Sequence, residues 1–312
     1  KLKSAAGEMF GWCAEPTHNI EGNNCLRFIV GNVVVYVTTD GNVTFGVLDA
    51  PNSSFSMRAG SITANSGSLN ILGTSVSNFG GESITANNGV SIKIEGKPTS
   101  GSASNAVSFT NITINAHKGT AASAGGIDIT GTASTGAGIS IINNSTIAGG
   151  NVKLIGKSDT TSTAVTSIAG TINASGDVTV EGTGAAKHGI FSNSNITSTG
   201  GSITLLGDVS TAGGGVGIGG GGFMNAAKDI KITGKTVGDN AVNVGVLTAG
   251  RDITIEGTSK YKNAILINNT VTAAGVVKMT GDITAKLFWE PNTAQDMARC
   301  IRMNQSGQCL CR

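Results

Sequence analysis

The sequence predicts an all-β protein whose chain winds as a parallel β-helix, with three short strands per coil and about 25 residues per coil. Three observations predict this fold. The composition is rich in glycine and poor in aromatic residues, a strand-like phrase ending in glycine recurs along the chain, and two further phrases share its period. Such repeats are typical of solenoids, in which each unit buries its apolar face against its neighbours.

The composition excludes several other classes of protein. The 312 residues include 47 Gly but only 4 Pro, and 13% are charged and 4% aromatic. The glycines have no Gly-X-Y period, which excludes collagen, and the regularly placed Val and Ile residues oppose disorder. The formal net charge of +2 includes no basic stripe, so we expect no nucleic-acid partner. We also expect no membrane insertion, because no apolar run is long enough to span a bilayer.

The first phrase reads apolar–x–apolar–x–Gly, as in "GDVTVEG" at 176–182 and "DITIEG" at 252–257. Alternation of this kind is typical of a short strand with one buried face. We therefore expect Val178 and Val180 to face the core and Gly182 to turn a corner. The glycines that close the phrase are Gly73, Gly96, Gly131, Gly156, Gly182, Gly207, Gly234, Gly257 and Gly281.

Two more phrases complete each coil. The second is an apolar residue, then Thr or Asn, then Ala, and begins at Ile62, Ile84, Ile114, Ile172, Met224, Leu247 and Val271, with variants at Ile147 and Ile196. The third is a small residue followed by an apolar one, and begins at Ala106, Gly138, Ala164, Gly189, Gly215, Ala241 and Ala264. A unit of three short strands cannot bury its apolar side alone, so we expect successive units to stack.

The two ends depart from the repeat. We expect an irregular or capping segment at 1–59 that leads into the helix, repeats at 60–285, and a cap or the start of a further domain at 286–312. The chain begins without Met or a signal-peptide core, so we expect a fragment of a longer protein.

All five cysteines lie in these end segments: Cys13, Cys25, Cys300, Cys309 and Cys311. They are either free thiols, or form Cys13–Cys25 plus one pair among the last three in an oxidising compartment. A zinc site is not expected, because no histidine accompanies the C-terminal cysteines.

The sequence offers little catalytic chemistry. Asp177, Asp229 and Asp252 each lie five residues before a phrase-ending glycine and could line one column, but Asn151 and Ser202 hold the same position in other coils. Solvated turn residues are the favoured interpretation. The glycine-rich run at 213–223 lacks the strand–helix context of a phosphate loop. We therefore expect no catalytic residue, metal or cofactor, and no enzyme activity.

The phrases "GDVTVEG", "GRDITIEG", "GGSITLLG" and "TINASGDVTV" resemble the repeats of bacterial exoproteins of the two-partner secretion type. This class includes filamentous haemagglutinin-like adhesins, high-molecular-weight adhesins and contact-dependent growth inhibition effectors, and the resemblance covers 60–285. It implies a right-handed β-helical filament on the surface of a Gram-negative bacterium, exported through an outer-membrane secretion partner. The secretion domain typical of the family is not recognisable, so an internal or distal piece is expected.

We therefore predict a secreted, cell-surface adhesin or receptor-binding segment that binds a host-cell glycan or an outer-membrane receptor on a target cell. The alternatives are a purely structural filament shaft or a β-helical enzyme acting on polysaccharides. Candidate contact residues are those that interrupt the repeat, and an ordinary solvated turn is the alternative for each. They are Lys97, His117, Lys118, Lys187, His188, Lys260, Tyr261 and Lys262.

Overall fold

The computed structural model describes residues 10–12, 25–30, 33–38, 43–45, 54–57, 60–78, 80–98, 105–118, 124–159, 164–168, 170–185, 188–209, 215–281, 288–289, 300–303 and 309–311. Only the backbone is described at 117–118, at 165–168 and in the strands outside 44–281.

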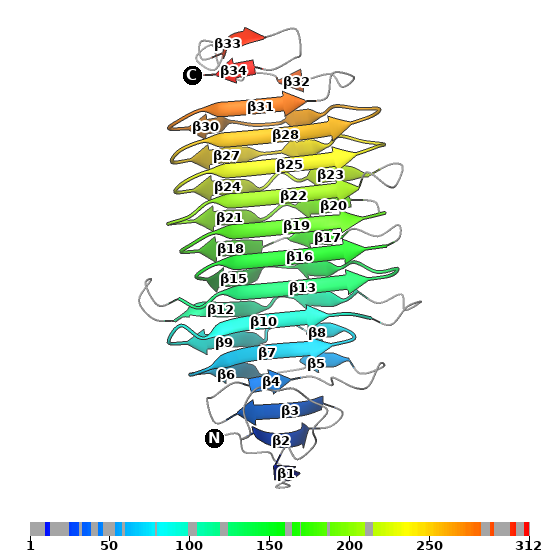
Figure 1. Ribbon diagram of the computed structural model, residues 1–312, viewed down its shortest axis with the longest axis vertical. Coiled ribbons are helices and arrows are strands. Elements are labelled where there is room, and N and C mark those ends of the chain that lie inside the picture. Colours follow the sequence, from blue (N-terminus) through cyan, green and yellow to red (C-terminus); the bar gives the residue numbers. More distant parts are fainter. Residues whose placement is uncertain are drawn as a thin grey trace.

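The described chain is all β and winds as a solenoid of about 8 turns with about 25 residues per turn. Its strands form three sheets, here called A, B and C, and each coil contributes one strand to each sheet. In Figure 1 the strands of sheet A run left to right across the front while the chain climbs from the N-terminal to the C-terminal end, which makes the coil right-handed. The predicted fold class is confirmed.

Within each of the three sheets, strands from successive coils pair in parallel. The parallel strands of sheet A are β4 (Val43–Phe45), β7 (Ser68–Gly73), β10 (Ser91–Gly96), β13 (Ile127–Ala133), β16 (Val152–Ser158), β19 (Val178–Gly184), β22 (Ile203–Val209), β25 (Ile230–Thr236), β28 (Ile253–Ser259) and β31 (Val277–Gly281). Sheet B contains β5 (Phe55–Met57), β8 (Val76–Asn78), β11 (Val107–Thr110), β14 (Ile139–Ile142), β17 (Val165–Ile168), β20 (His188–Ser192), β23 (Val216–Gly219), β26 (Val242–Val244), β29 (Ile265–Ile267) and β32 (Phe288–Trp289). Sheet C contains β6 (Ser61–Ala64), β9 (Ser83–Asn87), β12 (Thr113–Lys118), β15 (Ser145–Gly149), β18 (Gly170–Ala174), β21 (Asn195–Ser198), β24 (Phe223–Ala226), β27 (Val246–Ala249) and β30 (Val271–Ala273).

The glycines of the first phrase stack in one column of sheet A. The strand register pairs Gly73 with Gly96, Gly96 with Gly131, and so on without a slip to Gly281. The second phrase forms sheet C in the same way, and its variants Ile147 and Ile196 lie in the expected column. The alignment made from the sequence is therefore the register of sheets A and C.

One member of the third phrase is displaced by two residues. Ile190 pairs with Ile218 and Ile218 pairs with Val242, so the repeat in this coil begins at Gly217 and not at Gly215. A two-residue shift keeps the same side chains pointing inward, so periodicity alone cannot distinguish the two registers. Glycine is needed at position 217, because a Cβ there would lie only 2.5 Å from the carbonyl oxygen of Ala241.

The phrase-ending glycine does not turn the corner. Gly182 lies inside β19, which continues to Gly184, and it is absent from the described residues with positive φ. A Cβ on Gly182 would instead lie 2.0 Å from the carbonyl oxygen of Gly189, at the start of the sheet B strand in the same coil. Glycine is needed there because two backbones pass in close contact.

The core is a set of aliphatic columns that runs along the rod. The second inward position of sheet A is filled, strand after strand, by Ile71, Ile94, Ile129, Leu154, Val180, Leu205, Ile232 and Ile255, each at most 1% exposed. Each such side chain contributes about 1.5–3 kcal/mol by burial. Val178 and Val180 face this core as predicted.

Antiparallel strands follow the parallel coils at both ends of sheet A. At the N-terminal end, β1 (Phe10–Trp12), β2 (Cys25–Val30) and β3 (Val33–Thr38) continue the sheet beyond β4. At the other end, β34 (Cys309–Cys311) pairs with β31, and β33 (Cys300–Met303) pairs with β34. These strands occupy edges that would otherwise expose unpaired backbone groups. The division of the chain at 59/60 and 285/286 stays a prediction.

The cysteine prediction is not tested. Cys13 lies outside the described residues, and only the backbone is described at Cys25, Cys300, Cys309 and Cys311.

Candidate ligand-binding surfaces

Those predicted contact residues that the structure describes do not meet at one site. Lys97, His188 and the turn at 260–262 lie on the edge that joins sheet A to sheet B, here called the A–B edge, which is at the right-hand ends of the sheet A strands in Figure 1. Their coils are far apart, since β10 and β28 are separated by six strand steps, or about 29 Å at 4.8 Å per step. His117 and Lys118 end β12 of sheet C, toward the opposite edge.

Lys97 and His188 differ in how far they are exposed on the A–B edge. Lys97 is exposed, and its N–H donates to the carbonyl of Gly73 over 3.0 Å. His188 is half-buried: its Nδ1 accepts a hydrogen bond from the N–H of Val216 over 3.2 Å, and its ring lies 5.5 Å from the ring of Phe191. His188 therefore acts first as a contact between neighbouring coils. Lys187, the side chains of His117 and Lys118, and segments 99–104 and 119–123 lie outside what the structure describes.

The turn at Lys260–Lys262 has the clearest features of a contact site. Tyr261 is 67% exposed, and the ammonium of Lys260 lies 5.1 Å from the centroid of its ring. The next residue, Lys262, is fixed on the body of the coil, because its ammonium lies 3.1 Å from Oδ1 of Asp239.

The backbone of this turn is fixed by a serine. The Ser259 hydroxyl donates to the carbonyl of Asp239 over 2.6 Å, and accepts from the N–H of Lys262 over 3.2 Å. The turn thus presents an exposed aromatic ring between two cations on an ordered support. An aromatic ring beside cations suits an apolar or anionic group on a partner.

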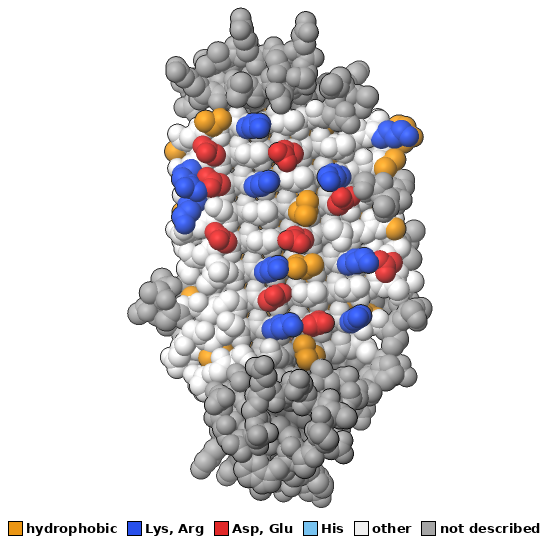
Figure 2. Space-filling model, viewed as in Figure 1, with side chains coloured by type: hydrophobic (Ala, Val, Ile, Leu, Met, Phe, Trp, Pro, Cys, Tyr) orange, Lys and Arg blue, Asp and Glu red, His pale blue; other side chains and the backbone are white. Residues whose placement is uncertain are grey.

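Sheet A presents charges of both signs on its outer face. Figure 2 shows Lys and Arg interleaved with Asp and Glu over this side of the rod. Pairs such as Lys93–Glu95 at 3.3 Å, Lys157–Asp159 at 3.2 Å and Lys235–Asp208 at 3.8 Å connect them. These side chains are about one-third to one-half exposed, so each pair adds little stability. The mixed signs give a ligand of one charge no continuous track.

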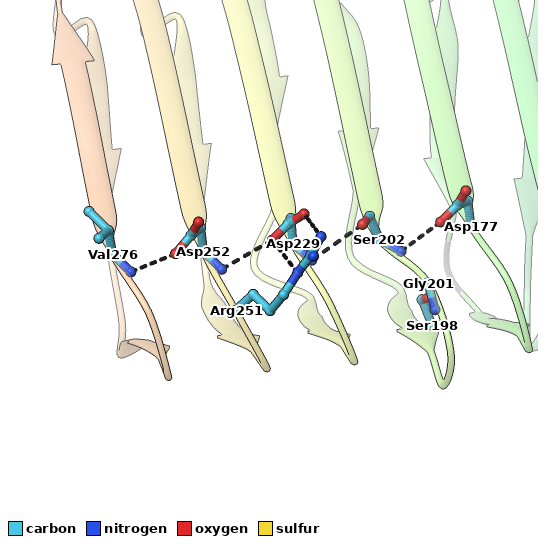
Figure 3. A network of polar contacts seen from close by, with 8 residues as sticks. All are labelled: Asp177, Ser198, Gly201, Ser202, Asp229, Arg251, Asp252 and Val276. Atoms are coloured by element: carbon cyan, nitrogen blue, oxygen red, sulfur yellow. Dashed lines mark hydrogen bonds and ion pairs between the residues drawn. The ribbon is translucent and has the colours of Figure 1, made fainter.

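The column containing the aspartates is a ladder of hydrogen bonds between coils (Figure 3). Asn151 Oδ1 accepts the N–H of Asp177 over 2.8 Å, and Asp177 Oδ1 accepts the N–H of Ser202 over 2.8 Å. The Ser202 hydroxyl accepts the backbone N–H of Asp229 over 3.3 Å, and Asp229 Oδ1 accepts the backbone N–H of Asp252 over 3.2 Å. Asp252 Oδ1 in turn accepts the backbone N–H of Val276 over 2.7 Å. These side chains are therefore not simply solvated turn residues: each connects its coil to the next.

The electrostatics at Asp229 favour its charged form. Arg251 donates hydrogen bonds to both carboxylate oxygens, and this contact is the main cause that lowers the pKa of Asp229 below its ordinary value. The N–H of Asp252 and the charge of Lys228 act in the same direction, and desolvation opposes them. A general acid needs a raised pKa, so Asp229 fits an electrostatic bridge better than an acid catalyst.

No group of three or more His, Cys, Asp or Glu suited to a metal ion occurs among the residues whose positions are described. Within the same residues there is no helix long and apolar enough to cross a membrane.

Sheet C carries an exposed aromatic residue that the sequence interpretation missed. Phe223 is 38% exposed and lies on the outer face of β24. The available signal was the second phrase itself, because the residue before it is Ser61, Ser83, Thr113 or another polar residue in most coils and Phe in this one. The interpretation treated that position as part of the scaffold only.

Comparisons with known proteins found no match of this chain to a family model, to a curated protein or to a solved structure.

Proposed function

We propose that this chain is a β-helical, non-catalytic binding segment of a bacterial surface exoprotein, secreted through an outer-membrane partner. It would bind a host-cell glycan or a receptor in the outer membrane of a target cell. The repeat phrases that resemble two-partner secretion exoproteins support the class, and the parallel β-helix is the architecture that this resemblance implies.

The observation that carries the binding role is the Lys260–Lys262 turn. Tyr261 projects from the A–B edge with 67% of its surface exposed, while Ser259 and Asp239 hold the turn in place. Exposed aromatic residues on ordered supports are frequent anchors in recognition, since little conformational entropy is lost when they bind.

The test is attachment of the purified chain to candidate host cells and to bacterial target cells. We expect saturable binding to one of them, and Tyr261→Ala should weaken it about tenfold, the loss of a contact of about 1.4 kcal/mol. Val276→Ala is the matched control, because Val276 is 48% exposed and precedes β31 on the other edge of sheet A. Equal binding by the Tyr261 and Val276 variants would remove the turn from the site.

A purely structural shaft is the second candidate. The hydrogen-bond ladder from Asn151 to Val276 and the unbroken glycine column favour it, because both strengthen the connection between coils and present nothing to a ligand. A shaft predicts no saturable binding of this chain to any cell, together with loss of attachment by the whole exoprotein when coils are deleted.

A further inference from the structure

The outer face of sheet C differs in kind from that of sheet A. Its outward positions form two columns in register across nine strands. The first column is Ser61, Ser83, Thr113, Thr146, Thr171, Asn195, Phe223 and Val246, followed by Thr270 just before β30. The second is Thr63, Thr85, Asn115, Ala148, Asn173, Thr197, Asn225, Thr248 and Thr272. We call these residues the sheet C face. None of them is ionisable.

The polar groups near the centre of this face are directed to solvent. Within the described residues, the side chains of Asn195, Thr197, Asn225 and Thr248 make no hydrogen bond to protein. Hydroxyl and amide groups both donate and accept, so each strand offers bonds of either sense. An ionic ligand would find no charge-assisted partner here, whereas a polyhydroxylated neutral ligand would find a matching partner on every strand.

Phe223 adds a flat apolar surface in the middle of these groups. Asn195 lies on the strand before it, Val246 on the strand after it, and Asn225 two residues along β24. The negative face of an aromatic ring attracts the weakly positive C–H groups of an apolar surface, and one face of a pyranose ring carries such groups.

The corner that leads to Phe223 leaves its ring uncovered. Residues 219–222 are all glycine. Gly220 and Gly222 are required by close packing on the previous coil, since a Cβ on Gly220 would lie 1.7 Å from the carbonyl oxygen of Ser192. Gly220 has a φ of 146°, and a Cβ on Gly222 would lie 2.1 Å from the carbonyl oxygen of Ser194. At Gly221 a Cβ would meet only Asn193 Oδ1, at 4.0 Å. No side chain therefore stands between this corner and the ring.

The spacing of the strands is compatible with an extended polymer of repeating units. Successive strands lie about 4.8 Å apart along the rod, which is close to the length of one hexose in an extended β-linked chain. We propose that the sheet C face binds an uncharged, β-linked polysaccharide laid along the rod. The Phe223 ring packs against one pyranose, and Thr and Asn side chains of adjacent strands bond to the sugar hydroxyls.

This inference goes beyond the proposed function and does not depend on the A–B edge. A chain that binds cells through Tyr261 can lack the sheet C site, and the reverse also holds, so the two proposals fail separately.

The test is native gel electrophoresis of the purified chain in gels containing hydroxyethylcellulose, a mixed-linkage β-glucan or a β-glucomannan. Dextran, which is α-linked, and alginate, which is anionic, serve as the reference polymers. We expect at least one β-glycan to retard the chain and neither reference polymer to do so. Phe223→Ala should weaken the apparent affinity at least tenfold, and Phe223→Trp should preserve it.

A second pair of variants keeps the test decisive if Phe223→Ala does not fold. Thr197→Val removes one hydroxyl from the sheet C face, and Thr254→Val makes the same change on the outer face of sheet A. We expect Thr197→Val to weaken β-glycan binding about threefold. Thr254→Val should leave the binding unchanged.

Several results would overturn the proposal. The proposal is wrong if none of the β-glycans retards the chain, or if alginate retards it as strongly as they do. It is also wrong if Phe223→Ala and Thr197→Val both bind β-glycan with the affinity of the unmodified chain. Sedimentation showing a dimer that Phe223→Ala dissociates would assign the face to a second copy of this chain. Thermal hysteresis in freezing solution without glycan binding would assign it to ice.

Discussion

A Cβ atom on Gly182 would lie 2.0 Å from the carbonyl oxygen of Gly189. The same approach recurs in other coils, at 2.1 Å between Gly234 and Ala241 and at 2.1 Å between Gly257 and Ala264. Glycine thus recurs at this position because the backbones of sheets A and B come into close contact in each of these coils.

Alanine at Gly182 should therefore destabilise the rod. The added methyl group must displace backbone, and overpacking of this kind costs about 1–3 kcal/mol. The free energy of unfolding from urea denaturation measures the effect. Gly126→Ala is the control, since a Cβ there would find its nearest neighbours at 3.8 Å. Equal stability of the two variants would contradict the steric explanation.

The ladder predicts that Asp177 acts as an acceptor and not as a charge. Its Oδ1 accepts the N–H of Ser202 over 2.8 Å, and Asn151 does the same for Asp177 one coil earlier. Asp177→Asn should leave the free energy of unfolding nearly unchanged, whereas Asp177→Ala should lower it by about 1 kcal/mol. If the Asn and Ala variants lose the same stability, the carboxylate charge matters more than the hydrogen bond.

The Asp229–Arg251 contact predicts a stability that depends on pH. In the folded chain the pKa of Asp229 is lowered below its ordinary value of 3.8, mainly by the hydrogen bonds from Arg251. Its contribution is therefore present above pH values near 3.8 and is lost as the pH falls through the lower folded value. Between neutral pH and pH 3, Asp229→Asn should lose less thermal stability than the unmodified chain does.

The size of this effect should be small and sensitive to salt. The Arg251 side chain is 60% exposed and Asp229 is 35% exposed, and exposed pairs contribute about 0.2–1 kcal/mol. Raising the salt concentration to about 1 M, where the Debye length is about 3 Å, should reduce the difference between Arg251→Ala and the unmodified chain. A difference that salt leaves unchanged would point to packing of the Arg251 stem.

The strand register makes a specific prediction about the C-terminal cysteines. Cys300 of β33 lies opposite Cys311 of β34 on the backbone, and cross-strand neighbours are within the Cα separation that a disulfide spans. Peptide mapping without reductant, on chain purified from an oxidising compartment, should recover Cys300 linked to Cys311 and Cys13 linked to Cys25. A recovered Cys309 link would contradict the first pairing.

The fold could be predicted because each coil repeats the same solution. The column from Gly73 to Gly281 and the second phrase from Ile62 to Val271 are the observed registers. The misplacement at Gly215 has a physical cause, since Gly215 and Gly217 have the same parity and are equally small. What distinguishes them is the close contact of Gly217 with Ala241, which only three-dimensional packing shows.

The candidate binding surfaces could be predicted less well. Interruptions of the repeat identified the turn at Tyr261, but they said nothing of its support by Ser259 and Asp239, since these bonds depend on the path of the turn. The aspartate column was recognised, whereas the donors to it were not, because they are backbone N–H groups without a sequence signature. Phe223 could not be singled out from the sequence, because it occupies a regular position of the repeat that is polar in most coils.

The direction of the strands has a mechanical consequence. Strands such as β19 and β22 lie across the rod and pair in parallel, so the hydrogen bonds between them point along its length. A pull on the two ends then loads these bonds in tension, and the rod yields by releasing one coil at a time. Each released coil lengthens the chain and dissipates work. A rod of this kind, anchored at one end and attached at the other, would extend stepwise under shear instead of breaking its attachment.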